Sequence, residues 1–424
     1  MTISYQPEQE QWTDLMERPK LKKKQLDQTV RAVFDDVKRN GQQALLKYAS
    51  MFDNYEENNF LVSSSDMNAA ADRLNSDIKS AIDRAYDNIK LFHESQMLQP
   101  KKVVVENGVT CWQEVRAIEK VGLYIPGGSA PLFSTVLMLG IPAKIAGCEE
   151  VVLCSPGPID DSILYCAKKL GIDKVFRIGG MQAIAALTYG SSEVPKVDKV
   201  FGPGNQYVTA AKQYALLEGL AIDMPAGPSE VLVIADKYAS PVFVAADLLA
   251  QAEHGLDSQV ILVSTSKNLL TEVEKELERQ QLDLPRAEIT NKALEYARLV
   301  YFEKEEDVIR FSNIYGPEHL IINTENYMDI STKIQTAGSV FLGAYSPESA
   351  GDYASGTNHT LPTNGFAKSY SGVELRSFQK TISFQELTRE GLENLGPSVE
   401  VMAKAEGLDA HARAVTYRLN ANKS

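Results

Sequence analysis

Two series of alternating apolar and helical segments constrain the fold of this 424-residue chain most strongly. The first series starts near Val121 and the second at Glu230, and in each one short runs rich in valine, isoleucine and leucine are separated by helical stretches. Such alternation is typical of parallel sheets covered by helices on both faces. We therefore expect an α/β protein with two doubly wound, Rossmann-like domains and a small, mostly helical C-terminal module.

The expected elements follow from apolar periodicity and capping signals. The first hundred residues are expected to be mostly helical, over 25–51 and 66–97. Further helices are expected from Ser134 to Ala146, ended by Gly147, and from Pro241 to His254. The expected strands are 123–126, 151–154, 174–178, 199–201, 221–224, 230–235, 259–263, 299–302, 319–323 and 339–342.

The expected division into domains follows these elements. Residues 1–24 form an N-terminal helical segment, and residues 369–424 form the C-terminal helical module. One α/β domain is discontinuous and contains residues 25–122 and 231–368, and the other contains residues 123–230. A stretch rich in serine, glycine and asparagine, from Ala344 to about Ser371, is long for an inert connection and is expected to be a functional loop.

The composition excludes several classes of protein. The 43 Lys and Arg residues against 56 Asp and Glu residues give a formal charge of −13, which argues against a surface for nucleic acid or anionic membranes. No apolar run has membrane-spanning length and the first ten residues lack signal-peptide character, so a cytoplasmic protein is expected. The four cysteines lack metal or redox spacing, and Cys148 and Cys154 are expected to be reduced core residues.

Four of the five histidines lie in polar clusters in the second half of the chain. Imidazole both ligates metals and titrates near neutral pH, so this placement favours an enzyme with one metal site beside one acid–base pair. The remaining histidine, His93, has no polar cluster near it and is expected on the surface or in helix packing. The clusters are Gln251-Ala-Glu-His254, Pro317-Glu318-His319, Asp352 with His359, and Glu406-Gly-Leu-Asp-Ala-His411.

Three of these clusters suit a metal, although each also has a structural interpretation. Gln251 and His254, three residues apart in the last turn of a helix, would share one face and reach one ion; they also suit a polar helix end. Asp352 lies in a glycine-containing turn that delivers a carboxylate, and such residues also favour turns without any function. A break between Glu406 and His411, with Asp409 capping a second helix, would let both face one point, or form a solvated helix–turn–helix.

The fourth cluster suits proton transfer. Glu318 and His319 lie at a loop–strand junction where a carboxylate and an imidazole can act as general acid and base. Adjacent side chains point apart in an extended segment, so they would serve different steps; a structural salt bridge is the alternative. Glycine-rich turns at 126–128, 179–180 and 202–205 follow expected strands and can hold a phosphate-bearing ligand, but none matches GxGxxG or a P-loop.

Taken together, these motifs closely resemble the histidinol dehydrogenase family, zinc- and NAD-dependent enzymes that complete histidine biosynthesis. The matches span most of the chain in the order found in the family. The matching segments are Val121-Gly-Leu-Tyr-Ile-Pro-Gly-Gly128, Phe201-Gly-Pro-Gly-Asn205, Asp223-Met-Pro-Ala-Gly-Pro-Ser229, Gln251-Ala-Glu-His254, Gly316-Pro-Glu-His319 and Glu406-Gly-Leu-Asp-Ala-His411.

The resemblance implies a set of ligands. It implies one Zn²⁺ per subunit, with Mn²⁺ as an open alternative, and histidinol bound to the ion through its imidazole and amino nitrogens. The implied metal ligands are Gln251, His254, Asp352 and His411. The implied substrate contacts are the same four residues together with Ser229, His319, His359 and Glu406. The implied NAD⁺ contacts, in the domain of residues 123–230, are Tyr124, Gln182 and Asn205.

The resemblance also implies a reaction and an assembly. L-histidinol would be oxidised through L-histidinal to L-histidine by two NAD⁺, with His319 as general acid and base and Glu318 activating water. Family members are homodimers in which the C-terminal module reaches the other site, so Glu406 and His411 would cross the interface.

Three alternatives remain open at this point. A metal-dependent hydrolase would use a similar metal, Glu and His, but would not need dinucleotide contacts. A non-catalytic zinc or amino-acid binding protein would leave Glu318 and His319 without a role. A relative that oxidises another amino alcohol is disfavoured by the match at Ser229, His359 and Glu406.

Overall fold

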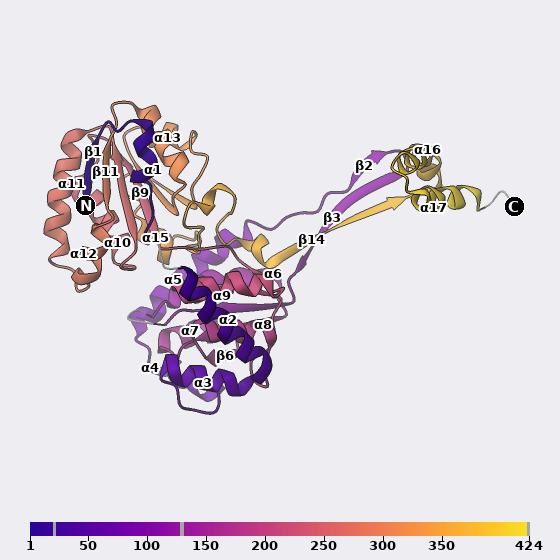
Figure 1. Cartoon of the computed structure of the whole chain (residues 1–424), viewed down its shortest axis with the longest axis horizontal. Coiled ribbons are helices and arrows are strands. Elements are labelled where there is room, and N and C mark those ends of the chain that lie inside the picture. Colours follow the sequence, from indigo (N-terminus) through magenta and orange to yellow (C-terminus); the bar gives the residue numbers. More distant parts are fainter. Residues whose placement is uncertain (20–22, 128–130, 422–424) are drawn as a thin grey trace. The chain divides into compact units, whose positions relative to one another are not determined.

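The computed structural model describes residues 1–19, 23–127 and 131–421, and the chain divides into two compact units. The main unit contains residues 1–96 and 118–378, and the C-terminal unit contains residues 97–117 and 379–424 (Figure 1). The expected turn at 126–128 lies partly outside the described residues. Residues 20–22 of the expected N-terminal segment and residues 422–424 of the expected C-terminal module also lie outside them. Within the described part, no helix is both long and apolar enough to cross a membrane.

The first sheet of the main unit is parallel, and helices cover both of its faces. Val121 and Leu123 pack into one core, whereas Tyr124 and Cys154 pack into the other, as the alternation of side chains along strands requires. In sheet order, the strands are β6 (Lys174–Arg177), β5 (Glu150–Ser155), β4 (Lys120–Tyr124), β7 (Lys199–Phe201) and β8 (Ala221–Ile222). The helices that supply the two cores are α2 (Lys23–Asn40), α3 (Gln42–Asp53), α4 (Ser64–Arg73), α5 (Ser76–Glu94), α6 (Phe133–Ala146), α7 (Asp161–Lys169), α8 (Gly180–Tyr189) and α9 (Gln206–Leu217).

The second sheet of the main unit is also parallel and has helices on both faces. Its strands, in sheet order, are β1 (Thr2–Tyr5), β11 (Arg298–Tyr301), β10 (Gln259–Ser264), β9 (Glu230–Ala235), β12 (His319–Asn323) and β13 (Ser339–Leu342). Its helices are α1 (Trp12–Leu15), α10 (Pro241–Ala252), α11 (Lys267–Gln281), α12 (Ala287–Leu294), α13 (Glu305–Tyr315) and α14 (Tyr327–Ser331). These two sheets confirm the expected doubly wound α/β architecture.

The C-terminal unit combines a sheet with two helices. Its antiparallel strands pair in the order β14 (Gln379–Leu387), β3 (Val109–Ala117) and β2 (Val103–Glu106), and α16 (Arg389–Ala405) and α17 (Asp409–Asn420) follow. The helical prediction for residues 369–424 is therefore confirmed for the two helices but missed β14. That strand pairs with residues more than 260 positions earlier, so local periodicity carries no sign of it.

Several expected boundaries were wrong. The helix expected over 25–51 is broken at Gly41, whose φ of +51° suits glycine. The long connection after Ala344 contains the short helix α15 (Glu348–Tyr353) and the 3₁₀ turns at Phe366–Lys368 and Leu375–Phe378. The expected grouping of residues 25–122 with 231–368 also differs from the observed packing, because α2–α5 pack against the sheet of residues 120–222.

A buried ion pair holds the loop after β7. Lys212 Nζ donates to the Gly202 carbonyl at 2.8 Å and pairs with Asp223, while Asp223 Oδ2 accepts from Gly202 N at 2.9 Å. Both side chains are nearly inaccessible to water, at 5% and 1% exposure. The loop that carries Asn205 is therefore held by charges shielded from solvent.

We predict that Lys212→Met lowers the free energy of unfolding by about 3 kcal/mol, because it leaves the Asp223 charge buried without its partner. The matched control is Lys38→Met, which removes an exposed pair with Glu218 of 2.8 Å and should lower the free energy of unfolding far less, because solvent screens the pair. Urea unfolding followed by circular dichroism measures both. Equal losses in the two variants would contradict this role.

Candidate catalytic and metal site

Adjacent strands of the second sheet bring the Glu318–His319 pair next to Glu230. Strands β9 and β12 are parallel neighbours, with His319 opposite Val231, so both strands begin at the same edge of the sheet. Glu230 N donates to Glu318 Oε2 at 2.9 Å, and His319 Nδ1 lies 3.3 Å from the Glu230 carbonyl oxygen. The main chain at the start of β9 therefore contacts both members of the expected acid–base pair.

His319 lies between two carboxylates. Its Nδ1 is 3.6 Å from Glu318 Oε2, and its Nε2 is 3.5 Å from Asp352 Oδ1. The expectation that Glu318 and His319 point apart was wrong. Glu318 precedes the first residue of β12, so the alternation of a pleated strand does not apply to it.

A carboxylate that the sequence analysis missed completes this cluster. Glu348 and Asp352 are four residues apart on α15 and therefore share one face of that helix. One donor atom from each of Glu348, Asp352 and His254 lies within 4.8 Å of the others. The spacing of the two acids was the available signal, but the segment was interpreted as a loop. Carboxylate and imidazole donors at this separation fit Zn²⁺ or Mn²⁺.

Burial and the neighbouring charges together shift the pKa values of this cluster. Burial raises the pKa of Glu318 to about 8 and the pKa of Glu348 to about 8. Burial alone would lower the pKa of His319, but Glu348, Glu318 and Asp352 outweigh it and raise that pKa to about 10. For Asp352, burial alone would raise the pKa, but the hydrogen bond to His319 and the charges of the nearby histidines outweigh burial and lower it. Three acids held out of water form an environment that favours a cation.

His359 contacts the main chain of Asp352, and Gln251 lies three residues before His254 in the chain. Helix α10 ends at Ala252, so Gln251 is buried in its last turn while His254 lies two residues beyond it and is exposed. The expectation that both lie in the helix was wrong for His254. His359 Nδ1 is 2.8 Å from the Asp352 carbonyl oxygen, and its Nε2 is 3.0 Å from Thr135 Oγ1. Asp352 and His359 therefore meet, as their shared loop suggested.

Two further expectations concern residues beside the site. Ser229 directly precedes β9, and its carbonyl accepts from Gln259 N at 3.0 Å. His93 is a packing residue, as expected: it is buried, and its Nδ1 lies 2.9 Å from the Ile89 carbonyl oxygen. Its Nε2 is 3.3 Å from Asn358 Nδ2, so His93 has a polar neighbour that the sequence around it did not predict.

The three residues expected to contact NAD⁺ follow strands of the first sheet. Tyr124 ends β4, Gln182 lies in the first turn of α8 after β6, and Asn205 caps α9 after β7 through bonds to Tyr207 N and Val208 N. The Tyr124 hydroxyl accepts from Gly180 N at 3.1 Å. These positions lie at the carboxyl ends of parallel strands, where α/β sheets bind ligands.

Gln182 supplies a buried acceptor for a ligand. Its Nε2 donates to Asp53 Oδ2 at 3.1 Å, and the same oxygen accepts from Gly179 N at 2.9 Å. Its Oε1 is buried and has no hydrogen-bond partner among the described residues. A buried acceptor left unpaired costs about 1–3 kcal/mol, so this oxygen suits a ligand that donates a hydrogen bond, as the adenine amine or ribose hydroxyls of NAD⁺ do.

Glu406 and His411 belong to the C-terminal unit. Glu406 is the C-cap residue after α16, Gly407 has a φ of +74°, and His411 lies in the first turn of α17. The expected break is therefore confirmed, but Asp409 is the first residue of α17 and Leu408 takes the cap position. Both candidate ligands are exposed, and their role in the site of the main unit stays a prediction.

The cysteines lie outside this chemistry. Cys148, Cys154 and Cys166 are buried, and none of the four forms a disulfide. Burial raises the pKa of Cys148 to about 11 and shifts the pKa of Cys154 and Cys166 upward as well. The expected core role of Cys148 and Cys154 is confirmed, because such thiols carry little thiolate at neutral pH.

Known proteins match the chain along nearly its whole length. A histidinol dehydrogenase from Bacteroides thetaiotaomicron is 54% identical over 427 residues, covering 100% of both chains. One from Vibrio parahaemolyticus is 53% identical and covers 97% of this chain and 96% of its own. The crystal structure of histidinol dehydrogenase from Elizabethkingia anophelis superposes with a TM-score of 0.98 at 51% identity, covering 100% of this chain and 99% of that one.

The family model of histidinol dehydrogenase matches residues 16–419, which include every strand of the two parallel sheets except β1, the carboxylate cluster and all but the last residue of the two C-terminal helices. A match of this extent, at this identity to relatives of the same length, leaves one assignment: the chain belongs to the histidinol dehydrogenase family.

Proposed function

We propose that this protein oxidises L-histidinol through L-histidinal to L-histidine, the last step of histidine biosynthesis, and reduces two NAD⁺ in doing so. Family membership supports the reaction class. The observation that carries the proposal is the position of His319 between the carboxylates of Glu318 and Asp352, beside the donor atoms of His254 and Glu348. This arrangement combines a proton-transfer group with donors for a cation.

His319 is the general acid and base of the proposal. The Glu230 carbonyl can only accept a hydrogen bond, so it selects the ring form that carries its proton on Nδ1. The acids around His319 raise its pKa to about 10, and a cation held beside them would offset their charges and lower it. Nε2 would then take the proton of the substrate alcohol while hydride passes to NAD⁺. The Asp352 carboxylate, 3.5 Å from Nε2, stabilises the imidazolium that results.

Glu318 acts in the second oxidation. Its carboxylate is held by Glu230 N and lies buried beside His319. We propose that it takes a proton from the water that attacks histidinal, so that a second hydride can pass to a second NAD⁺. A pKa of about 8 in a buried carboxyl suits a group that must accept a proton near neutral pH.

The metal site of the proposal uses residues from both units. Gln251, His254 and Asp352 would hold Zn²⁺, with Mn²⁺ as the alternative, and His411 of the partner subunit would complete the shell. When bound, the ion fixes the imidazole and amino nitrogens of histidinol and so orients the reacting carbon. Ser229 and His359, together with Glu406 of the partner subunit, would contact the substrate. The proximity of His254 and Asp352 supports two of these ligands.

The cofactor and the assembly follow from the same proposal. Tyr124, Gln182 and Asn205 would contact NAD⁺, with the buried Gln182 Oε1 as acceptor. The protein would act as a cytoplasmic homodimer, with residues 369–424 as the dimerisation module. The C-terminal unit supports dimerisation because it exposes many large apolar side chains that a partner would cover. Those that are 64–68% exposed are Val104, Val105, Val401, Met402 and Tyr417.

The reaction predicts about two NADH per L-histidinol, because an alcohol becomes an acid through two hydride transfers. NADH absorbance at 340 nm measures this ratio in the zinc-loaded protein. Chelation should abolish the signal and zinc should restore it. A ratio near one, or full activity after verified removal of metal, would contradict the four-electron reaction or the metal dependence, respectively.

Substitution of the acid–base pair should separate the two oxidations. We expect His319→Asn to lower kcat by about 10²–10⁴-fold with histidinol, since no other group takes the alcohol proton. Glu318→Gln should retain the first hydride transfer in single-turnover experiments and lose the oxidation of added histidinal. Equal loss of both oxidations in Glu318→Gln would contradict the separate role of Glu318.

A shared site predicts complementation between inactive subunits. Asp352→Asn and His411→Ala should each be inactive alone. An equimolar mixture that exchanges subunits should recover about a quarter of the native activity, because half of its dimers are mixed and each mixed dimer holds one intact site of two. The matched control mixes Asp352→Asn with His254→Ala. Both substitutions lie in the main unit, so every site of the mixed dimer keeps one of them and activity should not recover. Failure to recover in proven heterodimers would contradict donation of His411 across the interface.

A further inference from the structure

We propose that Arg18 is a positioning residue for Glu318 and His319 and that it acts through Glu230. The inference rests on the proposed function and extends it to the segment before the first long helix. Arg18 is 212 positions from Glu230 in the sequence, yet its guanidinium donates to both carboxylate oxygens of that residue through Nε and Nη2. No motif in the sequence drew attention to either residue.

Glu230 connects three parts of the site. Its N–H donates to Glu318 Oε2, its carbonyl lies 3.3 Å from His319 Nδ1, and it follows the candidate substrate residue Ser229 directly. A displacement of the Glu230 main chain would therefore alter the orientation of both reacting side chains. The position of Glu230 depends in turn on what holds its own side chain.

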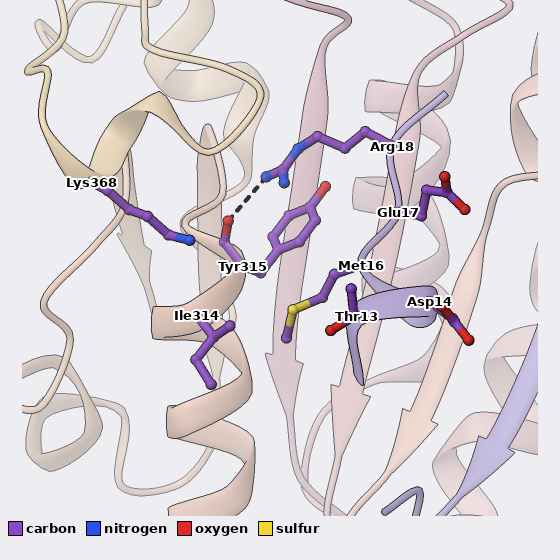
Figure 2. A pocket seen from close by; sticks show the side chains of 8 residues that line it. All are labelled: Thr13, Asp14, Met16, Glu17, Arg18, Ile314, Tyr315 and Lys368. Atoms are coloured by element: carbon purple, nitrogen blue, oxygen red, sulfur yellow. Dashed lines mark hydrogen bonds between the residues drawn. The ribbon is translucent and has the colours of Figure 1, made fainter. Parts of the chain in front are cut away.

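The Glu230 carboxylate is held in a buried polar cluster. It is 1% exposed, and Tyr315 Oη lies 2.8 Å from both Glu230 Oε2 and Gln259 Oε1. The Arg18 guanidinium lies 3.9 Å from the centre of the Tyr315 ring and donates to the Tyr315 carbonyl at 3.0 Å (Figure 2). A planar guanidinium suits this combination of a two-point ion pair with stacking on an aromatic ring.

Removal of Arg18 would leave the Glu230 charge out of water without its cation. The charged carboxylate would then move toward solvent, and this movement would disturb the start of β9. Space is available for a substituted side chain, because a pocket of about 430 Å³ opens beside Arg18. The pocket is lined by Thr13, Asp14, Met16, Glu17, Arg18, Ile314, Tyr315 and Lys368 (Figure 2).

The test compares three variants of the zinc-loaded, full-length protein. Arg18→Met should lower kcat for histidinol by about 10²-fold through misplacement of the reacting groups and leave KM for NAD⁺ within about twofold. The double variant Arg18→Met/Glu230→Gln should recover about tenfold of that loss, because it no longer buries an unpaired charge. The matched control is Arg73→Met, which removes a two-point pair with Asp161 on the surface and should keep the native kcat.

A second readout does not require turnover. In ¹⁵N-histidine NMR, assigned with His319→Asn, Arg18→Met should shift the ring signals of His319 and leave those of His93 unchanged. A native kcat together with unshifted His319 signals in Arg18→Met would overturn the inference. A double variant no more active than Arg18→Met would also count against it. A native protein that forms no NADH would contradict the proposed function, and the His319 signals would still decide the positioning role.

Discussion

The hydrogen bonds between the Glu230 main chain and the Glu318–His319 pair connect the second sheet to the chemistry. Backbone groups at the start of a central strand move less than side chains on a loop, because the neighbouring strands hold them. The carbonyl orients the imidazole, and the N–H fixes the carboxylate. The site therefore inherits its geometry from the parallel pairing of β9 and β12.

The buried acids of the same site carry an electrostatic cost. Glu318, Glu348 and Asp352 are all buried, and the charge of His319 lowers the pKa of each of them. Such an arrangement is costly unless a cation or a proton is taken up. That cost favours the metal site that we propose over a structural salt bridge, which was the open alternative for Glu318 and His319.

The central strands β5, β9, β10 and β12 were predicted well because each is a short apolar run that is buried along nearly its whole length, and the local sequence shows this directly. The edge strand β1 escaped prediction, and so did β2, β3 and β14, since their residues are more exposed. The partners of β1 and β14 also lie far away in the chain. The helical spacing of Glu348 and Asp352 was present in the sequence. It was hidden by serine, glycine and proline around it, which are typical of loops.

The sequence by itself determined the class of fold, the family and the residue types available for chemistry, because apolar periodicity and clustered motifs are local properties. Only the tertiary structure decided which acids share a site with His319 and how they are held. Glu348 on α15 approaches His254, which follows α10, and Arg18 reaches Glu230 across 212 positions. Contacts of this kind depend on how strands and helices pack, which no local pattern records.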